Sequence, residues 1–195
     1  MEAEELRQSV LLFDTPDKWN AFLELSRQTD RLKRMMTRPA VERADRYFQL
    51  EHPKPKWSFR QFSPDEFSMV WYLTEYGEYS ICLVFHWDGI FVLEARGGCN
   101  DVAKTTALLQ EARFRILLEC FERIDTWWDN HLLAKEKFNF SFGTSADGHY
   151  GPFRLAWHAH YNTESLINQL GRKLAPFQTP EMTQLLSELN ALTKK

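Results

Sequence analysis

Residues 68–98 read SMVWYLTEYGEYSICLVFHWDGIFVLEARGG, and the rest of the chain is organised around this stretch. It is rich in aromatic and β-branched residues, which favour strands. Asp88-Gly89 is a strong two-residue hairpin turn because both central positions tolerate positive φ, and Gly77-Glu78 is a second such turn. The stretch therefore predicts two successive β-hairpins.

The two turns also predict which residues face each other. The later turn places Phe85 opposite Val92, and the earlier one places Tyr72 opposite Leu83. Because strand side chains alternate between faces, one face is expected to be core: Met69, Trp71, Leu73, Cys82, Val84, Phe91, Leu93 and Ala95. The other face is apolar but dotted with hydroxyl groups, so it is either covered by helices or a binding surface: Val70, Tyr72, Tyr76, Tyr79, Ile81, Leu83, Phe85, Val92, Glu94 and Arg96.

The flanking regions predict helices and further strands. Thr15-Pro16-Asp17 is a helix start, and Arg38-Pro39 is expected to end that helix. In chain order we expect a helical part over 1–52, the hairpin sheet over 57–98, one long helix over 100–134, further strands over 137–161 and C-terminal helices over 163–193. The pattern predicts a single α+β domain over 1–195, a mostly antiparallel sheet with helices packed on it.

Composition narrows the class of protein. A chain of 195 residues with 44% hydrophobic residues can build a core, and a net charge of −3 gives no general attraction to nucleic acid or membranes. Cys82, Cys99 and Cys120 lack metal-ligand spacing and indicate free thiols in a reducing cytosol. The acidic N-terminus is unlike a signal peptide, and no apolar run approaches the roughly 20 residues that span a bilayer. We expect a cytoplasmic protein without a cofactor or a membrane partner.

One catalytic alternative rests on Glu94-Ala95-Arg96 at a predicted strand end. Nucleases of the PD-(D/E)xK type use strand carboxylates to hold a metal and a Lys two residues on to orient water. Here that position is Arg96, which cannot act as a neutral amine, and the nearest upstream acid, Asp88, is explained by the turn. Glu94 and Arg96 are thus candidates for a divergent nuclease, or else a solvated strand end.

Three histidines are candidate metal ligands. His158 and His160 share a face if residues 153–161 form a strand, and His149 lies in the preceding loop. Three imidazoles can bind zinc, but no Cys, Asp or Glu at a suitable spacing supports this site. Gly97-Gly98 before a helix resembles an anion-binding terminus, although a turn-forming glycine pair is commoner.

Basic residues are concentrated in residues 27–60. Within this segment Arg31, Arg34 and Arg38 follow each other at three- and four-residue spacing, so a helix would project all three from one side. Arginine forms forked contacts with carboxylate or phosphate. The segment is either an ordinary solvated helix face or a surface for an acidic protein or a nucleic-acid backbone.

These observations predict a non-catalytic binding protein that acts through a macromolecular partner, as antagonist or immunity-type proteins and regulatory adaptors do. The expected partner is a protein, and the sequence is also compatible with a homo-oligomer. Partner-binding candidates are Arg31, Arg34, Arg38, Tyr72, Tyr76 and Tyr79. The alternatives are the divergent metal-dependent nuclease and a nucleic-acid-binding accessory protein that uses residues 27–60.

Overall fold

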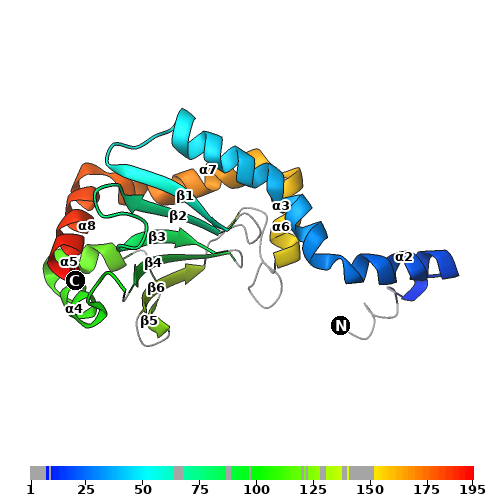
Figure 1. The fold of residues 1–195 in the computed structure, drawn as a ribbon, viewed down its shortest axis with the longest axis horizontal. Coiled ribbons are helices and arrows are strands. Elements are labelled where there is room, and N and C mark those ends of the chain that lie inside the picture. Colours follow the sequence, from blue (N-terminus) through cyan, green and yellow to red (C-terminus); the bar gives the residue numbers. More distant parts are fainter. Residues whose placement is uncertain are drawn as a thin grey trace.

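A computed structural model describes residues 8, 10–63, 68–86, 89–96, 98–119, 121, 123–127, 131–137, 140 and 152–195. The predicted α+β class is confirmed, because helices pack on a six-stranded sheet of order β1-β2-β3-β4-β6-β5, in which every pairing is antiparallel (Figure 1). The strands are β1 (Trp57–Ser63), β2 (Ser68–Leu73), β3 (Cys82–Phe85), β4 (Ile90–Arg96), β5 (Arg123–Trp127) and β6 (His131–Lys137).

Helices precede, interrupt and follow the strands. Thr15 caps the first of them, as predicted, and Asp101 and Thr179 cap two others, since each side chain accepts a hydrogen bond from a backbone N–H three residues on. The helices are α2 (Pro16–Arg27), α3 (Thr29–Arg46), the π-helical turn η1 (Tyr47–Glu51), α4 (Val102–Leu108), α5 (Ala112–Arg115), η2 (Ile116–Leu118), α6 (Pro152–Tyr161), α7 (Thr163–Leu174), η3 (Ala175–Gln178) and α8 (Pro180–Thr193).

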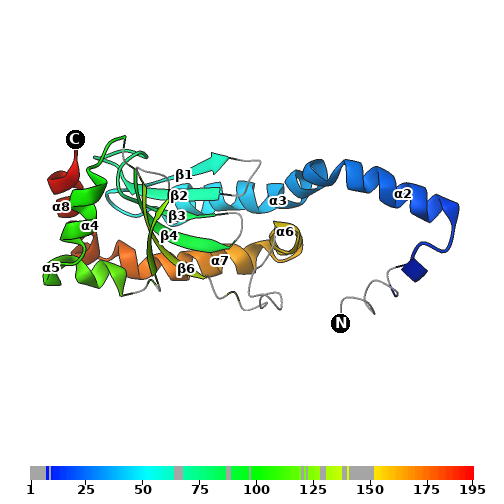
Figure 2. The same cartoon turned by 90° about the horizontal axis from the view of Figure 1, so that it is seen from below.

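The main core lies between one face of the sheet and the helices, with α7 running along the sheet (Figure 2). Its largest buried side chains come from β2, β3, β4 and the helices, among them Met69, Trp71, Leu83, Phe85, Phe91, Leu93, Phe114, Leu170 and Phe177. On the opposite face a smaller cluster of Val70, Cys82, Val84 and Val92 is also buried. The centre of the second face is therefore buried rather than open to solvent.

Both hairpins exist, but the predicted register was wrong in each. Phe85 pairs with Phe91 rather than Val92, and Tyr72 pairs with Cys82 rather than Leu83. The backbone N–H of His86 bonds to the carbonyl of Ile90 at 2.8 Å, so three residues, not two, separate this pair. Gly89 has the positive φ that the turn requires, at 84°.

The earlier hairpin differs because its loop is long. Residues 74–81 join β2 to β3, and the carbonyl of Leu73 accepts hydrogen bonds from the backbone N–H groups of Tyr76 and Gly77. A shift of one residue moves every side chain of a strand to the other face. Two such shifts invert β3 alone, so Leu83 and Phe85 lie in the main core, whereas β2 and β4 keep their predicted faces.

The predicted long helix over 100–134 was wrong. α4 and α5 are short, and the chain then forms β5 and β6, with β6 paired to β4. Phe114 and Leu117 are buried in the main core, so the chain turns there instead of continuing along one axis. The strand pairing also gives the second edge of β4 its backbone hydrogen bonds, which an extended helix could not supply.

The predicted strand over 153–161 was also wrong, because these residues form α6. Leu155, Ala156 and Ala159 are buried while Trp157 and Tyr161 are exposed, which is the spacing of a helix face rather than strict alternation. Residues 1–7 and 9 of the expected helical part, and residues 138, 139 and 141–151 of the expected further strands, lie outside the described residues.

The prediction that Arg38-Pro39 ends a helix was wrong, because α3 continues through Pro39. The break comes earlier, at Gln28 between α2 and α3. Proline cannot donate a backbone hydrogen bond inside a helix. The buried positions Thr37, Ala40 and Ala44 nevertheless hold α3 in place, since two of them belong to the main core.

Candidate partner-binding surface

The arm, which we define as residues 10–35, comprises α2 and the first part of α3 and extends away from the sheet (Figures 1 and 2). No residue of α2 is buried. Among the described residues, eight of the fourteen exposed large hydrophobic side chains lie in the arm: Val10, Leu11, Leu12, Trp19, Phe22, Leu25, Leu32 and Met35. Exposed apolar side chains gathered on one element mark an interaction site more often than scattered ones do.

Three aromatic rings form the centre of this apolar surface. Phe13 lies 5.6 Å from Trp19 and 4.7 Å from Phe22, and Trp19 lies 5.5 Å from Phe22, measured between ring centroids. Trp19 remains 47% exposed and Phe22 40% exposed. The rings are thus pre-arranged by contact with one another, and much of their surface stays available to a partner.

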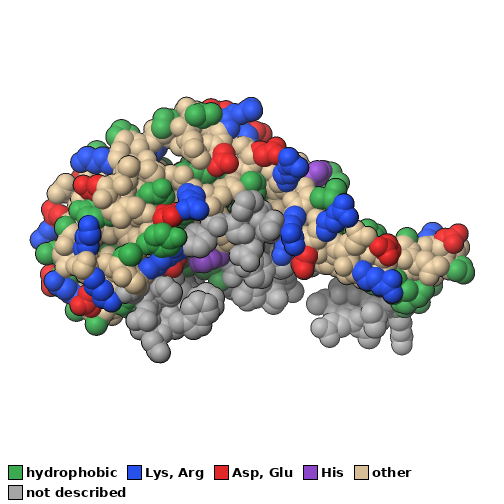
Figure 3. All heavy atoms as spheres, viewed as in Figure 1, with side chains coloured by type: hydrophobic (Ala, Val, Ile, Leu, Met, Phe, Trp, Pro, Cys, Tyr) green, Lys and Arg blue, Asp and Glu red, His purple; other side chains and the backbone are tan. Residues whose placement is uncertain are grey.

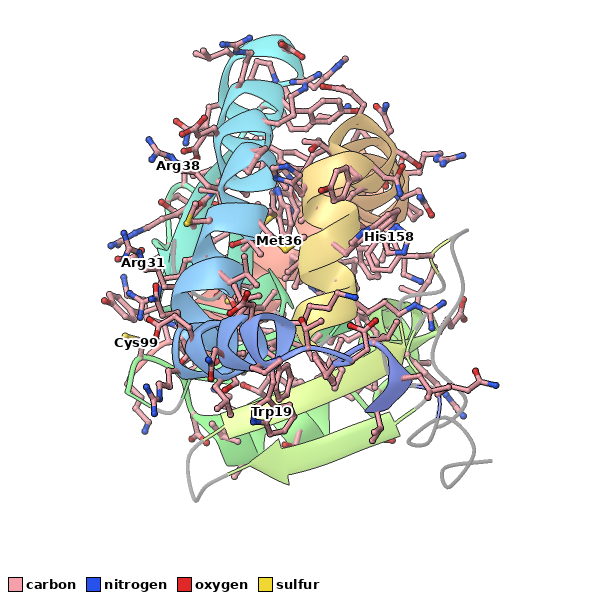
Figure 4. The ribbon with its side chains drawn as sticks, turned by 90° about the vertical axis from the view of Figure 1, so that its right-hand side faces the viewer. Trp19, Arg31, Met36, Arg38, Cys99 and His158 are labelled. Carbon is pink, nitrogen blue, oxygen red and sulfur yellow. The ribbon has the colours of Figure 1, made fainter. Side chains whose placement is uncertain are left out.

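The basic stripe, which we define as Arg31, Arg34 and Arg38, lies on α3 as the spacing predicted. All three side chains are exposed, and the Nε of Arg38 donates to Glu42 at 2.7 Å. Arg31 and Arg38 project to the same side of α3, away from α6, while Met36 lies between the two helices (Figure 4). Lys and Arg side chains, drawn in blue, also gather where the arm leaves the body, by which we mean the sheet and the helices that pack on it (Figure 3).

The three candidate tyrosines do not form one surface. Tyr72 is half-buried beside the smaller cluster, whereas Tyr76 packs on the main core with its hydroxyl 3.2 Å from the Oγ of Ser187. Tyr79 is exposed in the 74–81 loop, where the guanidinium of Arg96 lies 5.6 Å from its ring. The long loop therefore separates residues that a two-residue turn would have aligned.

Glu94 and Arg96 are paired with each other rather than open to solvent. The Nε of Arg96 donates to Oε1 of Glu94 at 2.9 Å, and both side chains are largely buried.

Burial, with a smaller contribution from Glu94, raises the pKa of the Cys82 thiol far above its usual range. Cys82 is thus held as a neutral thiol, which is a poor nucleophile.

The premise of the histidine site was wrong. His158 and His160 lie on α6, where positions two residues apart point to nearly opposite sides, and His149 lies outside the described residues. Nδ1 of His158 lies 2.8 Å from Nδ2 of Asn162. Burial first, and then the charge of Arg154, lowers the pKa of His158. Within the described part of the chain, no three His, Cys, Asp or Glu residues gather as metal ligands do.

Sequence reasoning missed the exposure of the arm and a hollow in the body. Trp19, Phe22 and Leu25 look like any core stripe, because a sequence does not reveal whether a helix packs on a sheet. The hollow, of about 240 Å³, lies where η1 meets the end of α7, beside Tyr47, His52 and Gly171. The π-helical turn places the ring of His52 against the ring of Tyr47, with ring centroids 4.2 Å apart. No pattern in the sequence predicts that turn.

Comparisons with protein-family models, curated proteins and solved structures find no match for this chain. Among the described residues, no helix combines the length and the apolar character needed to cross a membrane. The arguments about function therefore start from the arm and its two surfaces.

Proposed function

We propose that this protein is a non-catalytic, cytoplasmic binding protein that holds a macromolecular partner through the basic stripe. The observation that carries the proposal is the exposure of Arg31, Arg34 and Arg38 along one side of a helix that leaves the body. Free thiols at Cys82 and Cys99 agree with a reducing compartment.

The partner is a protein with a carboxylate-rich surface. Met35 is 62% exposed and lies four positions after Arg31 and three before Arg38 on α3, so the stripe combines charge with an apolar contact. Arginine suits such a mixed surface, because its guanidinium forms forked bonds to carboxylates and is weakly hydrated. An antagonist or a regulatory adaptor would work in this way, by occupying an acidic surface of its target.

A nucleic-acid backbone is the second candidate, and the same stripe favours it. Phosphates bind arginine as carboxylates do, but neutralising several phosphates gives a steep dependence of affinity on salt. Capture of partners from the native cell, followed by mass spectrometry with and without nuclease treatment, separates the two candidates. A protein that remains captured after nuclease treatment supports the protein partner, and loss of all capture supports nucleic acid.

The decisive variant is R31A/R34A/R38A. We expect it to weaken binding of the captured partner by roughly 3- to 150-fold, since each exposed pair contributes about 0.2–1 kcal/mol, and to flatten the dependence on salt. A matched control is R46A/R115A/R172A, which removes three exposed arginines outside the stripe and the arm. Equal affinity of the two variants would contradict the proposal.

A further inference from the structure

The hollow where η1 meets the end of α7 lies outside the arm and the basic stripe. Its volume is about 240 Å³, which exceeds the roughly 150 Å³ of a protein cavity that holds one benzene molecule. Tyr47 and Phe48, which line it, are half-buried, whereas the lining side chains His52, Lys54 and Arg172 are exposed. The hollow therefore has room for a small ligand with one ring, and it combines an aromatic wall with exposed cations.

The helices lose stability where they form this hollow. The backbone N–H of His52 donates to the carbonyl of Tyr47 at 2.8 Å, which is the five-residue spacing of a π-helical turn. Such turns are rare and occur frequently at functional sites. Gly171 of α7 has no Cβ, and a Cβ there would lie 2.8 Å from the phenol oxygen of Tyr47. Glycine is unfavourable inside a helix, so both η1 and α7 depart from the most stable local structure at the same place.

Aromatic rings give the hollow a surface that suits a planar ligand. The ring centroids of Tyr47 and His52 lie 4.2 Å apart, and Phe48 meets Tyr47 edge-on at 4.9 Å. Phe48 also contacts Trp71 of the main core at 5.0 Å. Rings that their neighbours already hold lose little conformational freedom when a ligand binds. The aromatic wall is thus arranged before any ligand arrives.

The charges around the hollow favour an anion. Among the described residues that line it, none is acidic. Arg43, whose guanidinium lies over the ring of Tyr47, takes up two carboxylates of this region, with Glu51 at 2.8 Å and Glu164 at 2.5 Å. Within the described part of the chain, neither Lys54 nor Arg172 forms an ion pair. Two cations that no carboxylate neutralises attract a negatively charged ligand.

We infer that the hollow binds a small aromatic anion, a single ring that carries a phosphate or a carboxylate. This inference goes beyond the proposed function, which concerns the basic stripe. The ring lies against Tyr47 and His52, and Lys54 and Arg172 bind the anionic group. Arginine forms forked bonds to such a group, and lysine contacts it as a point charge. The prolines on both sides of Lys54 restrict its backbone, which lowers the entropy lost on binding.

An NMR titration of the ¹⁵N-labelled full chain with phenyl phosphate tests the inference. We expect saturable shifts of amides within residues 47–54 and 171–178, with a dissociation constant on the order of a millimolar for a ligand of this size. Benzoate should shift the same amides, and the tighter of the two ligands identifies the anionic group. Inorganic phosphate and benzyl alcohol each lack one half of the ligand and should bind at least tenfold more weakly.

Two kinds of variant separate charge from space. Lys54→Gln with Arg172→Gln should weaken phenyl phosphate binding by roughly two- to thirtyfold, because two exposed ion pairs are lost. The matched control, Lys104→Gln with Arg115→Gln, removes the same charges at exposed positions outside the hollow and should bind as the wild type does. Ala175→Phe keeps both cations but fills the hollow, since Ala175 is an exposed lining residue, and should block binding.

The amide spectra also report whether each variant is folded, so a loss of binding can be assigned to the site. The inference is overturned if phenyl phosphate and benzoate give no saturable shifts at the hollow, or if the two double variants bind equally well. Benzyl alcohol binding as tightly as phenyl phosphate would overturn the anion, and inorganic phosphate binding as tightly would overturn the ring. None of these results depends on the basic stripe, so the proposed function is tested separately.

Discussion

The aromatic residues of the sheet and those of the arm differ in their exposure to solvent. Trp71 of β2 is 1% exposed and packs against Phe48 and Phe59, whereas Trp19 of α2 is 47% exposed and has Phe13 and Phe22, both in the arm, as its ring contacts among the described residues. The two tryptophans have the same side chain and the same hydrophobic gain on burial. The difference teaches that the aromatic residues of the sheet are buried within the chain, while those of the arm leave apolar surface exposed.

A matched pair of substitutions should show the largest contrast. Trp71→Ala empties a packed site in the main core and should lower the free energy of unfolding by about 3–5 kcal/mol. Trp19→Ala should change it by less than about 0.5 kcal/mol when measured on dilute protein, because the side chain is not packed in the fold. Chemical denaturation of both variants makes the comparison. Similar losses would mean that the arm is part of the folding unit.

Small residues should behave differently in the two regions as well. A Cβ at Gly171 would lie 2.8 Å from the phenol oxygen of Tyr47, so Gly171→Ala should destabilise the body by about 1–3 kcal/mol despite the better helix propensity of Ala. Asn20→Ala on exposed α2 should be neutral or slightly stabilising. Thermal unfolding of both variants decides this, and a Gly171→Ala protein as stable as the wild type would show that Tyr47 moves aside.

The smallest expected effect is a dependence on pH that arises in the body and not in the arm. Because burial lowers the pKa of His158, the unfolded chain takes up a proton before the folded one as the pH falls. The contribution of His158 is therefore fully present above about pH 6.5, the ordinary value for histidine, and is lost as the pH falls below it. His158→Gln should flatten the fall in melting temperature in that range, with His160→Gln as control. An unchanged slope would show that another group is responsible.

Sequence reasoning succeeded where a local signal decides a local structure. Thr15, Asp101 and Thr179 cap helices because their side chains bond to nearby backbone groups, and the aromatic and β-branched stretch at 68–98 forms strands. It failed where one residue changes the outcome. A shift of one residue at each of the two turns inverted β3 relative to its neighbours, although both hairpins were placed along the chain as predicted.

Other failures have a non-local cause. The helical pattern over 102–134 ended early because Phe114 and Leu117 are drawn into the core and β6 pairs with β4. Of the candidate site, the basic stripe was predicted, since helix spacing alone aligns Arg31, Arg34 and Arg38. The exposure of Trp19 and Phe22 was not, because it depends on α2 lying beyond the sheet rather than on any feature of α2 itself.

The most direct test of this account is amide hydrogen exchange in α2, compared with exchange in the strands of the sheet. A twelve-residue helix without a buried residue is marginal on its own, so its amides should exchange rapidly in dilute protein. Amides of β2, β3 and β4, whose side chains are largely buried, should exchange slowly in the same sample. Protection of α2 as strong as that of these strands would contradict the account, because the arm would then be stabilised within its own chain.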